Sequence, residues 1–133
     1  MSVLELNGRV FDASTTGTLT LTSEGGAATT DVTQGLVKCW GHFEGSDATL
    51  DDSFNTSSLG DSGTGNFLVH FSNNMGNVNY HADANGNISL ADAANGLAAV
   101  LNPATANMGL FTASSGGLID SNDTSYSNCG DLA

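Results

Sequence analysis

The tetrapeptide Gly60-Asp61-Ser62-Gly63 contains the residue types in this chain that come nearest to catalytic chemistry. The same four residues surround the nucleophile of one class of serine proteases, where the serine also needs a histidine base, a carboxylate that orients this base and an oxyanion hole. His42 and His70 are the nearest candidate bases, but each lies in a strand-like segment without such partners. We therefore interpret the tetrapeptide as a polar hairpin turn and predict that the chain is not an enzyme.

The segment Asp61-Ser62-Gly63 also permits an aspartic-protease interpretation, in which two small subunits each supply one aspartate to a buried pair that shares a proton. Two apolar residues precede the aspartate in such enzymes. Here Leu59-Gly60 precedes it, and no second element of this kind is evident in the sequence. The pattern therefore favours a turn over an acid dyad.

Two oxygen-rich segments could in principle hold a cation. Residues 83–88 with Asp92 fit the later part of a calcium-binding loop, but His81 stands at the first ligand position and is a poor ligand for a hard cation. Asn85-Gly86 is also the strongest hairpin signal in the chain, so we expect a hairpin there. We interpret Asp120-Ser121-Asn122-Asp123 as a solvated turn and expect no metal and no other cofactor.

The charge balance narrows the possible partners. Arg9 and Lys38 are the only strong bases against 14 carboxylates, and the formal net charge is −12. Such a surface repels phosphate backbones and anionic lipids, so we expect no nucleic-acid partner and no membrane partner. No apolar run is long enough to span a membrane, and Met1-Ser2-Val3 lacks the basic start of a secretion signal. We therefore expect synthesis in the cytoplasm of a host cell.

The elements that must position these residues are strands. Alternating apolar residues define one face of two segments within 36–71. Gly41 interrupts the first segment, where a bulge or a close backbone approach is expected. Cys39 lies on the apolar side and is predicted to be a buried free thiol, because two cysteines are too few for a disulfide framework. The apolar positions are Val37, Cys39 and Phe43 in the first segment and Phe67, Val69 and Phe71 in the second.

Composition and the remaining strand patterns predict an all-β fold. The chain has 133 residues with 17 Gly, one Pro and no long apolar helical period, which is typical of short strands joined by turns. We expect seven to nine strands in an antiparallel β-sandwich of jelly-roll type, with Pro103 in a loop or at a strand edge. The later strand candidates are Val78–Ala82, Asn87–Ala91, Leu97–Leu101, Asn107–Thr112 and Gly117–Ile119.

A short extended N-terminal arm is expected to precede this sandwich. Residues 1–30 form the arm and its linker, which begins at Ser23, and residues 31–133 form the sandwich domain. The short strands of the arm cannot close a core of their own, so we predict that they attach to a partner surface. The predicted attachment or interface residues are Val3, Leu4, Leu6, Val10, Phe11, Leu19, Leu21 and Trp40.

Two aromatic residues fall outside the apolar faces. Trp40 lies opposite the apolar stripe of its strand, so it either packs under a second layer or anchors a subunit contact. Phe54 follows in a polar, turn-rich segment, where we expect it to plug the core.

One set of residues between Gln34 and Ala133 carries a family resemblance: Lys38, Trp40, Phe43, Gly45, Asp52-Ser53-Phe54-Asn55, Ser57-Ser58, Asp61, Gly63-Thr64-Gly65, Phe67, Val69, Phe71, Met75, Asn79, Tyr80 and Gly130-Asp131-Leu132-Ala133. Over most of this range the chain resembles a module of virion structural proteins of tailed phages, particularly marine ones, which occurs in tail-fibre, head-fibre and capsid-surface proteins.

This resemblance implies a non-enzymatic protein on the virion surface, displayed as a homotrimer. Because the chain is short and has no long stalk, we favour a capsid-surface decoration (cement) or head-fibre protein, attached by its arm to the major capsid protein or to fibre and tail proteins. The alternatives are a tail-fibre tip that binds a host receptor or a host-surface glycan, and a small hydrolase that uses the Gly-Asp-Ser-Gly segment.

Overall fold

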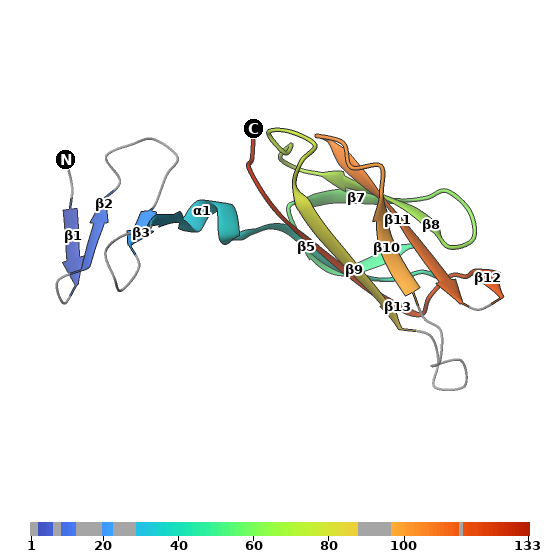
Figure 1. The fold of residues 1–133 in the computed structure, drawn as a ribbon. Helices are drawn as coiled ribbons and strands as arrows, with labels where there is room; N and C mark the ends of the chain where they lie inside the picture. The colour runs from blue at the N-terminus through green and yellow to red at the C-terminus, as the bar shows by residue number, and fades with distance from the viewer. Residues whose placement is uncertain (1–2, 7–8, 13–19, 23–28, 88–96, 115) are drawn as a thin grey trace. The chain divides into compact units, whose positions relative to one another are not determined.

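The computed structural model describes residues 3–6, 9–12, 20–22, 29–87, 97–114 and 116–133. Its contacts divide the chain into two compact units, Met1–Leu36 and Val37–Ala133, and each is described by itself. Both units are built mainly from antiparallel strands, which confirms the all-β prediction (Figure 1). The division falls after Leu36, whereas the sequence analysis placed the boundary after Thr30.

The N-terminal unit contains two small antiparallel strand pairs and one helical turn. In the first pair Leu4 lies opposite Phe11, and in the second Leu21 lies opposite Thr30. Thr29 and Thr30, which we had expected in a linker, therefore belong to a strand. The elements are β1 (Val3–Leu6), β2 (Arg9–Asp12), β3 (Thr20–Thr22), β4 (Thr29–Asp31) and α1 (Val32–Gly35).

The helical turn α1 begins where an amide of its first turn finds a side-chain partner. The Asp31 carboxylate accepts a hydrogen bond from the backbone amide of Thr33 at 2.9 Å, as N-cap residues do. No helix among the described residues is long and apolar enough to cross a membrane.

The second unit, called here the sandwich unit, consists of two antiparallel sheets (Figure 1). One has the strand order β6-β5-β13-β9, and the other β10-β11-β8-β7 with β12 paired to β11. The edge strands β9 and β10 pack against each other. The strands are β5 (Val37–Glu44), β6 (Thr49–Phe54), β7 (Thr56–Asp61), β8 (Asn66–Phe71), β9 (His81–Asn87), β10 (Leu97–Leu101), β11 (Asn107–Ser114), β12 (Gly117–Leu118) and β13 (Asp123–Cys129).

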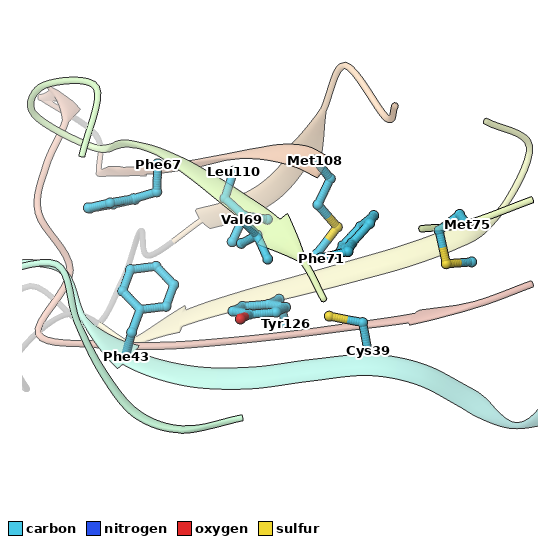
Figure 2. Packing of buried hydrophobic residues seen from close by; sticks show 9 residues of the cluster. All are labelled: Cys39, Phe43, Phe67, Val69, Phe71, Met75, Met108, Leu110 and Tyr126. Carbon is cyan, nitrogen blue, oxygen red and sulfur yellow. The ribbon is translucent and has the colours of Figure 1, made fainter. Parts of the chain in front are cut away.

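The core lies between the two sheets, and Figure 2 shows side chains from both converging there. The predicted alternation is confirmed in β5 and β8, except that Val37 is exposed at the start of β5. The rings of Phe43 and Phe67 meet edge to face across the core, with their centroids 4.9 Å apart. The buried apolar side chains are Cys39, Phe43, Phe67, Val69, Phe71, Met75, Met108, Leu110 and Tyr126.

Several predicted elements need correction. The segment that we interpreted as turn-rich contains two strands, β6 and β7, separated only by Asn55 with a positive φ of 58°. Asn85-Gly86 does not form a hairpin, because it lies inside β9, where Asn85 is paired with Ser125 of β13. Phe54 is 54% exposed and does not plug the core.

The limits of the other predicted strands differ to varying degrees. Leu97–Leu101 is confirmed as β10, and Pro103 lies in the loop that follows it. The strand expected from Val78 begins only at His81, and β11 extends beyond Thr112 to Ser114. The strand expected at Asn87–Ala91 lies outside the described residues, apart from Asn87.

One polar side chain of the core, that of Asn128 in β13, is completely buried without a hydrogen-bond partner for either amide atom among the described residues. It faces inward opposite Cys39 of β5 and Ala82 of β9. A buried amide without a partner costs free energy, because it loses its hydrogen bonds to water on folding.

We therefore expect Asn128→Leu, a change of similar size, to raise the free energy of unfolding by about 1 kcal/mol. Urea denaturation of the full chain measures this change, and Asn79→Leu at an exposed position is the control. If Asn128→Leu lowers the stability instead, a buried water or another polar partner satisfies the amide.

Candidate functional site

Gly60 and Asp61 end β7, and Ser62 and Gly63 begin the turn that leads to β8. The Asp61 carboxylate accepts a hydrogen bond from the Gly63 amide at 2.8 Å, and the Asn66 amide donates to the Gly63 carbonyl at 2.8 Å. The predicted polar turn is confirmed for Ser62 and Gly63, whereas Gly60 and Asp61 are paired residues of β7. Among the described residues, Ser62 makes no hydrogen bond to His42 or to His70, so the structure brings no base to its hydroxyl.

The oxygen-rich segments use their side chains within the protein. The Asp120 carboxylate accepts a hydrogen bond from the Gly65 amide at 2.7 Å, and Asp123 binds a histidine ring. Asp83 and Asn85 project from a strand rather than from a loop. Within the part of the chain that the structure describes, no three His, Cys, Asp or Glu side chains gather in a way that could hold a metal ion.

The side of the β6-β5-β13-β9 sheet that faces away from the core carries a mixed aromatic and polar surface, called here the outer face. Directly paired residues of adjacent strands point to the same side of a sheet, so the strand register shows which side chains are neighbours on this face. Trp40 lies between Phe54 of β6 and Ser127 of β13, and Ser127 lies beside Asp83 of β9. Trp40 is 39% exposed, so no second layer of the sandwich unit buries it.

The cross-strand neighbours of Trp40 form one row on the outer face, and His42 lies in the next row. It lies between Asp52 of β6 and Ser125 of β13, and Ser125 lies beside Asn85 of β9. The pairing of β5 with β6 is irregular between His42 and Phe43. At this irregularity the Asp51 side chain also reaches the histidine ring.

Two carboxylates hold the His42 ring between them. Nδ1 lies 2.8 Å from Asp51 Oδ2, and Nε2 lies 2.6 Å from Asp123 Oδ1. Both ring nitrogens can donate to carboxylates only in the protonated imidazolium. The hydrogen bond to Asp123, followed by that to Asp51, therefore raises the pKa of His42 above its ordinary value.

This raised pKa predicts a pH dependence of stability. The hydrogen-bonded imidazolium contributes fully to the free energy of unfolding below the unfolded-state pKa of about 6.5. This contribution is lost as the pH rises through the higher folded-state pKa. We expect the stability lost in His42→Gln to be greater at pH 5.5 than at pH 9, by less than about 1 kcal/mol because the group is partly exposed.

Thermal unfolding of both proteins at the two pH values measures this difference, and His81→Gln controls for the loss of a surface histidine. His81 pairs with Asp83 at 2.7 Å, but both side chains are largely exposed. An equal loss of stability at pH 5.5 and pH 9 would show that the two carboxylates do not favour the charged ring.

Two neighbouring hollows lie over β9 and β13. One has a volume of about 230 Å³ and the other about 390 Å³, and both are lined by Asn85 and Ser125. The first is completed by Asp83, Ala84, Tyr126 and Ser127, and the second by Gly86 and Asp123. The two hollows share Asn85 and Ser125 and lie beside the Trp40 row, and together they are called here the recess.

A chain of polar groups links the inner side of this sheet to Thr56, which lies on β7 of the other sheet and is partly buried. The Tyr126 hydroxyl is 2.8 Å from the Thr56 hydroxyl, which in turn is 3.3 Å from Cys39 Sγ. Burial raises the pKa of the Cys39 thiol and raises the pKa of Tyr126 to about 12. The structure thus confirms Cys39 as a buried free thiol, and Cys129 forms no disulfide with a described residue.

The predicted attachment residues are only partly described. Leu21 lies in β3 and is 42% exposed, and Trp40 lies on the outer face. Leu19 lies outside the described residues. For the others, the structure describes the backbone of β1 and β2 but not the side chains, so their role in attachment stays a prediction; they are Val3, Leu4, Leu6, Val10 and Phe11.

The outer face was not predicted from the sequence as a site, because its residues come from four strands that are far apart in the chain. No family model, no curated protein and no solved structure matches this chain.

Proposed function

We propose that the chain is a structural protein of a tailed-phage virion, displayed on the capsid surface as a decoration (cement) or head-fibre protein. The observation that carries this proposal is the division into a small strand-rich unit, Met1–Leu36, and a larger sandwich unit, Val37–Ala133. This organisation suits a protein that attaches through one unit and displays the other. Synthesis in the host cytoplasm and assembly as a homotrimer belong to the same proposal.

The N-terminal unit has the properties of an attachment element. Its strands contain only three or four residues, and pairs of this size are marginally stable alone. Free strand edges can pair with a strand of another chain, such as the major capsid protein or a fibre protein. We therefore assign attachment to this unit and display to the sandwich unit.

The jelly-roll connectivity is also part of the proposal. The sandwich unit forms one sheet of four strands and one of five, in which β12 is the short fifth strand. The chain passes from one sheet to the other four times, after β6, β8, β9 and β12. These crossings support a relationship with jelly-roll sandwiches, in which eight strands form two sheets.

The residues on which the phage resemblance rests have consistent positions in the sandwich unit. Phe43, Phe67 and Val69 fill the core, while Gly63 and Gly65 form the turn before β8. The small-hydrolase alternative has less support, because the Ser62 hydroxyl lies in this turn without a base. The tail-fibre-tip alternative draws support from the exposed aromatic residues of the outer face.

Counting the copies of the protein in purified virions of the phage that encodes it tests this proposal. Quantitative mass spectrometry should find hundreds of copies per particle, and antibody labelling should cover the shell. A few copies located at the tail would favour the tail-fibre tip, and absence from purified virions would overturn the virion assignment.

A second experiment tests the role of the N-terminal unit. Particles that lack the protein are incubated with the full chain or with a variant that begins at Val37. The full chain should load the particles, and the variant should fold, as judged by circular dichroism, but should not bind. If the variant loads to full occupancy, the sandwich unit carries the attachment.

A further inference from the structure

The outer face exposes two aromatic side chains next to each other. Trp40 and Phe54 are directly paired between β5 and β6, and they are 39% and 54% exposed. An aromatic ring has an electron-rich face, which attracts polarised C–H groups as well as cations. Paired rings on a rigid sheet therefore offer a platform for a flat ligand that carries C–H groups on one side.

Hydrogen-bonding groups surround this platform on the side of β13 and β9. Ser127 and Asp83 continue the row of Trp40, and Ser125 and Asn85 line the recess beside it. Since neighbouring strands are about 4.8 Å apart, Asp83 lies about 10 Å from Trp40 across the sheet. Hydroxyl, amide and carboxylate groups at these distances can bind several ligand hydroxyls at once.

The charge of the protein restricts the ligand. The formal net charge is −12, and Asp52, Asp83 and Asp123 lie on or beside the outer face. Sulfated, phosphorylated or sialylated ligands would be repelled. Carboxylates are instead good acceptors for the hydroxyl groups of an uncharged ligand.

A second copy of the chain fits this face less well. Two copies that met through this face would bring their Asp52, Asp83 and Asp123 carboxylates close together, which opposes association here. Trp40 and Phe54 are also surrounded by polar residues, whereas the cores of interfaces between copies are usually apolar and depleted of charge. The combination of two rings with hydroxyl, amide and carboxylate groups matches a sugar, which has an apolar ring face and hydroxyl edges.

We propose that the outer face binds a short neutral oligosaccharide. One sugar ring lies against Trp40 and Phe54, and the next extends over the recess, where Asp83, Asn85 and Ser127 bind its hydroxyl groups. The inference does not depend on attachment to a virion, because the residues involved all belong to the sandwich unit.

Trp40 is the only tryptophan of the chain, so its fluorescence reports directly on this site. The full chain is titrated with neutral di- and trisaccharides of glucose, galactose, mannose and N-acetylglucosamine, and with sialylated and sulfated glycans as a comparison. At least one neutral saccharide should change the fluorescence with saturation, and the charged glycans should not. Absence of binding at millimolar concentration, or binding of charged glycans only, would overturn the proposal.

Variants then locate the site by calorimetry with the saccharide that binds. Trp40→Ala should weaken binding about tenfold or more, Phe54→Ala and Asn85→Ala should also weaken it, and Leu118→Ala should not, because Leu118 is exposed on β12 of the other sheet. Thermal unfolding shows whether each variant is folded. Unchanged affinity in folded Trp40→Ala and Phe54→Ala would contradict the assignment of this face.

Sedimentation of the wild type and of Trp40→Ala separates the proposal from an interface between copies. The oligomeric state should be the same for both proteins. Dissociation of an oligomer by Trp40→Ala, with no effect of saccharides on the wild type, would show that a second copy occupies the outer face instead.

Discussion

Gly65→Ala should lower the free energy of unfolding of the sandwich unit by about 3 kcal/mol, and its thermal midpoint by about 15 °C. Gly65 has a positive φ of 66°, and a Cβ atom added there would clash with the carbonyl oxygen of Thr112 and lie 2.8 Å from the amide nitrogen of Ile119. These are backbone atoms, which cannot rotate away as the end of a side chain can.

The Gly65→Ala substitution would also break two hydrogen bonds of the Gly65 backbone. The Gly65 carbonyl accepts from the Thr112 amide at 2.8 Å, and the Gly65 amide donates to Asp120 at 2.7 Å. The added methyl group would push the turn away from β11 and so break both bonds. Thermal and urea unfolding of the full chain measure the loss.

Gly63→Ala provides the matched control for this effect. Gly63 also has a positive φ, of 110°, but a Cβ atom there would meet nothing within 4 Å. Gly63→Ala should lower the free energy of unfolding by about 1 kcal/mol, because only backbone strain is added. If the two variants lose the same stability, the contact with β11 is not the cause.

Gly41→Ala should destabilise the sandwich unit by about 2 kcal/mol. Gly41 lies directly opposite Tyr126 on β13, and an added Cβ would approach the ring to well within contact distance, at 2.8 Å from its Cε1 atom. Tyr126 is almost completely buried and its hydroxyl is bonded to Thr56. The ring therefore cannot move without giving up packing and a hydrogen bond.

Gly60→Ala is the control for Gly41→Ala, because it also places a methyl group within a strand. The nearest atoms to its Cβ would be 3.7 Å away, which is an ordinary contact. Its stability should stay the same or rise slightly, since alanine is less flexible than glycine in the unfolded chain. Equal destabilisation of both variants would mean that the Tyr126 ring moves easily.

The strands that could be predicted from the sequence are those with one apolar face. Alternation identified β5 and β8 because their inward positions carry Cys39, Phe43, Phe67 and Val69. The edge strands β6 and β7 were missed because polar residues dominate both of their faces. Each adds only a partly buried leucine, Leu50 or Leu59, to the core.

The hairpin expected at Asn85-Gly86 shows how tertiary contacts override a local pattern. The pairing of β9 with β13 keeps these residues extended, and Gly86 packs near Ala98 and Ser121 on the inner side. The close approach predicted at Gly41 is present, with Tyr126 as the neighbour. Gly41 therefore indicated correctly a position where space is short, whereas Gly86 did not indicate a turn.

The candidate site could not be predicted because its contacts join distant segments. His42 and Asp123 are separated by 81 positions in the sequence, and no motif connects them. The irregular pairing of β5 with β6 brings Asp51 to the His42 ring, and no residue type in these strands predicts this irregularity. Trp40 was identified as lying opposite the apolar stripe, but its neighbours on β6 and β13 depend on the sheet order.

The position of β13 between β5 and β9 affects how the chain folds. The first strand of the sandwich unit pairs with its last, with Phe43 opposite Thr124, so the contact order is high and folding should take milliseconds to seconds. Until β13 leaves the ribosome, β5 and β9 both present open edges that can pair with other nascent chains. Aggregation during synthesis should therefore depend on the delay between translation of β9 and translation of β13.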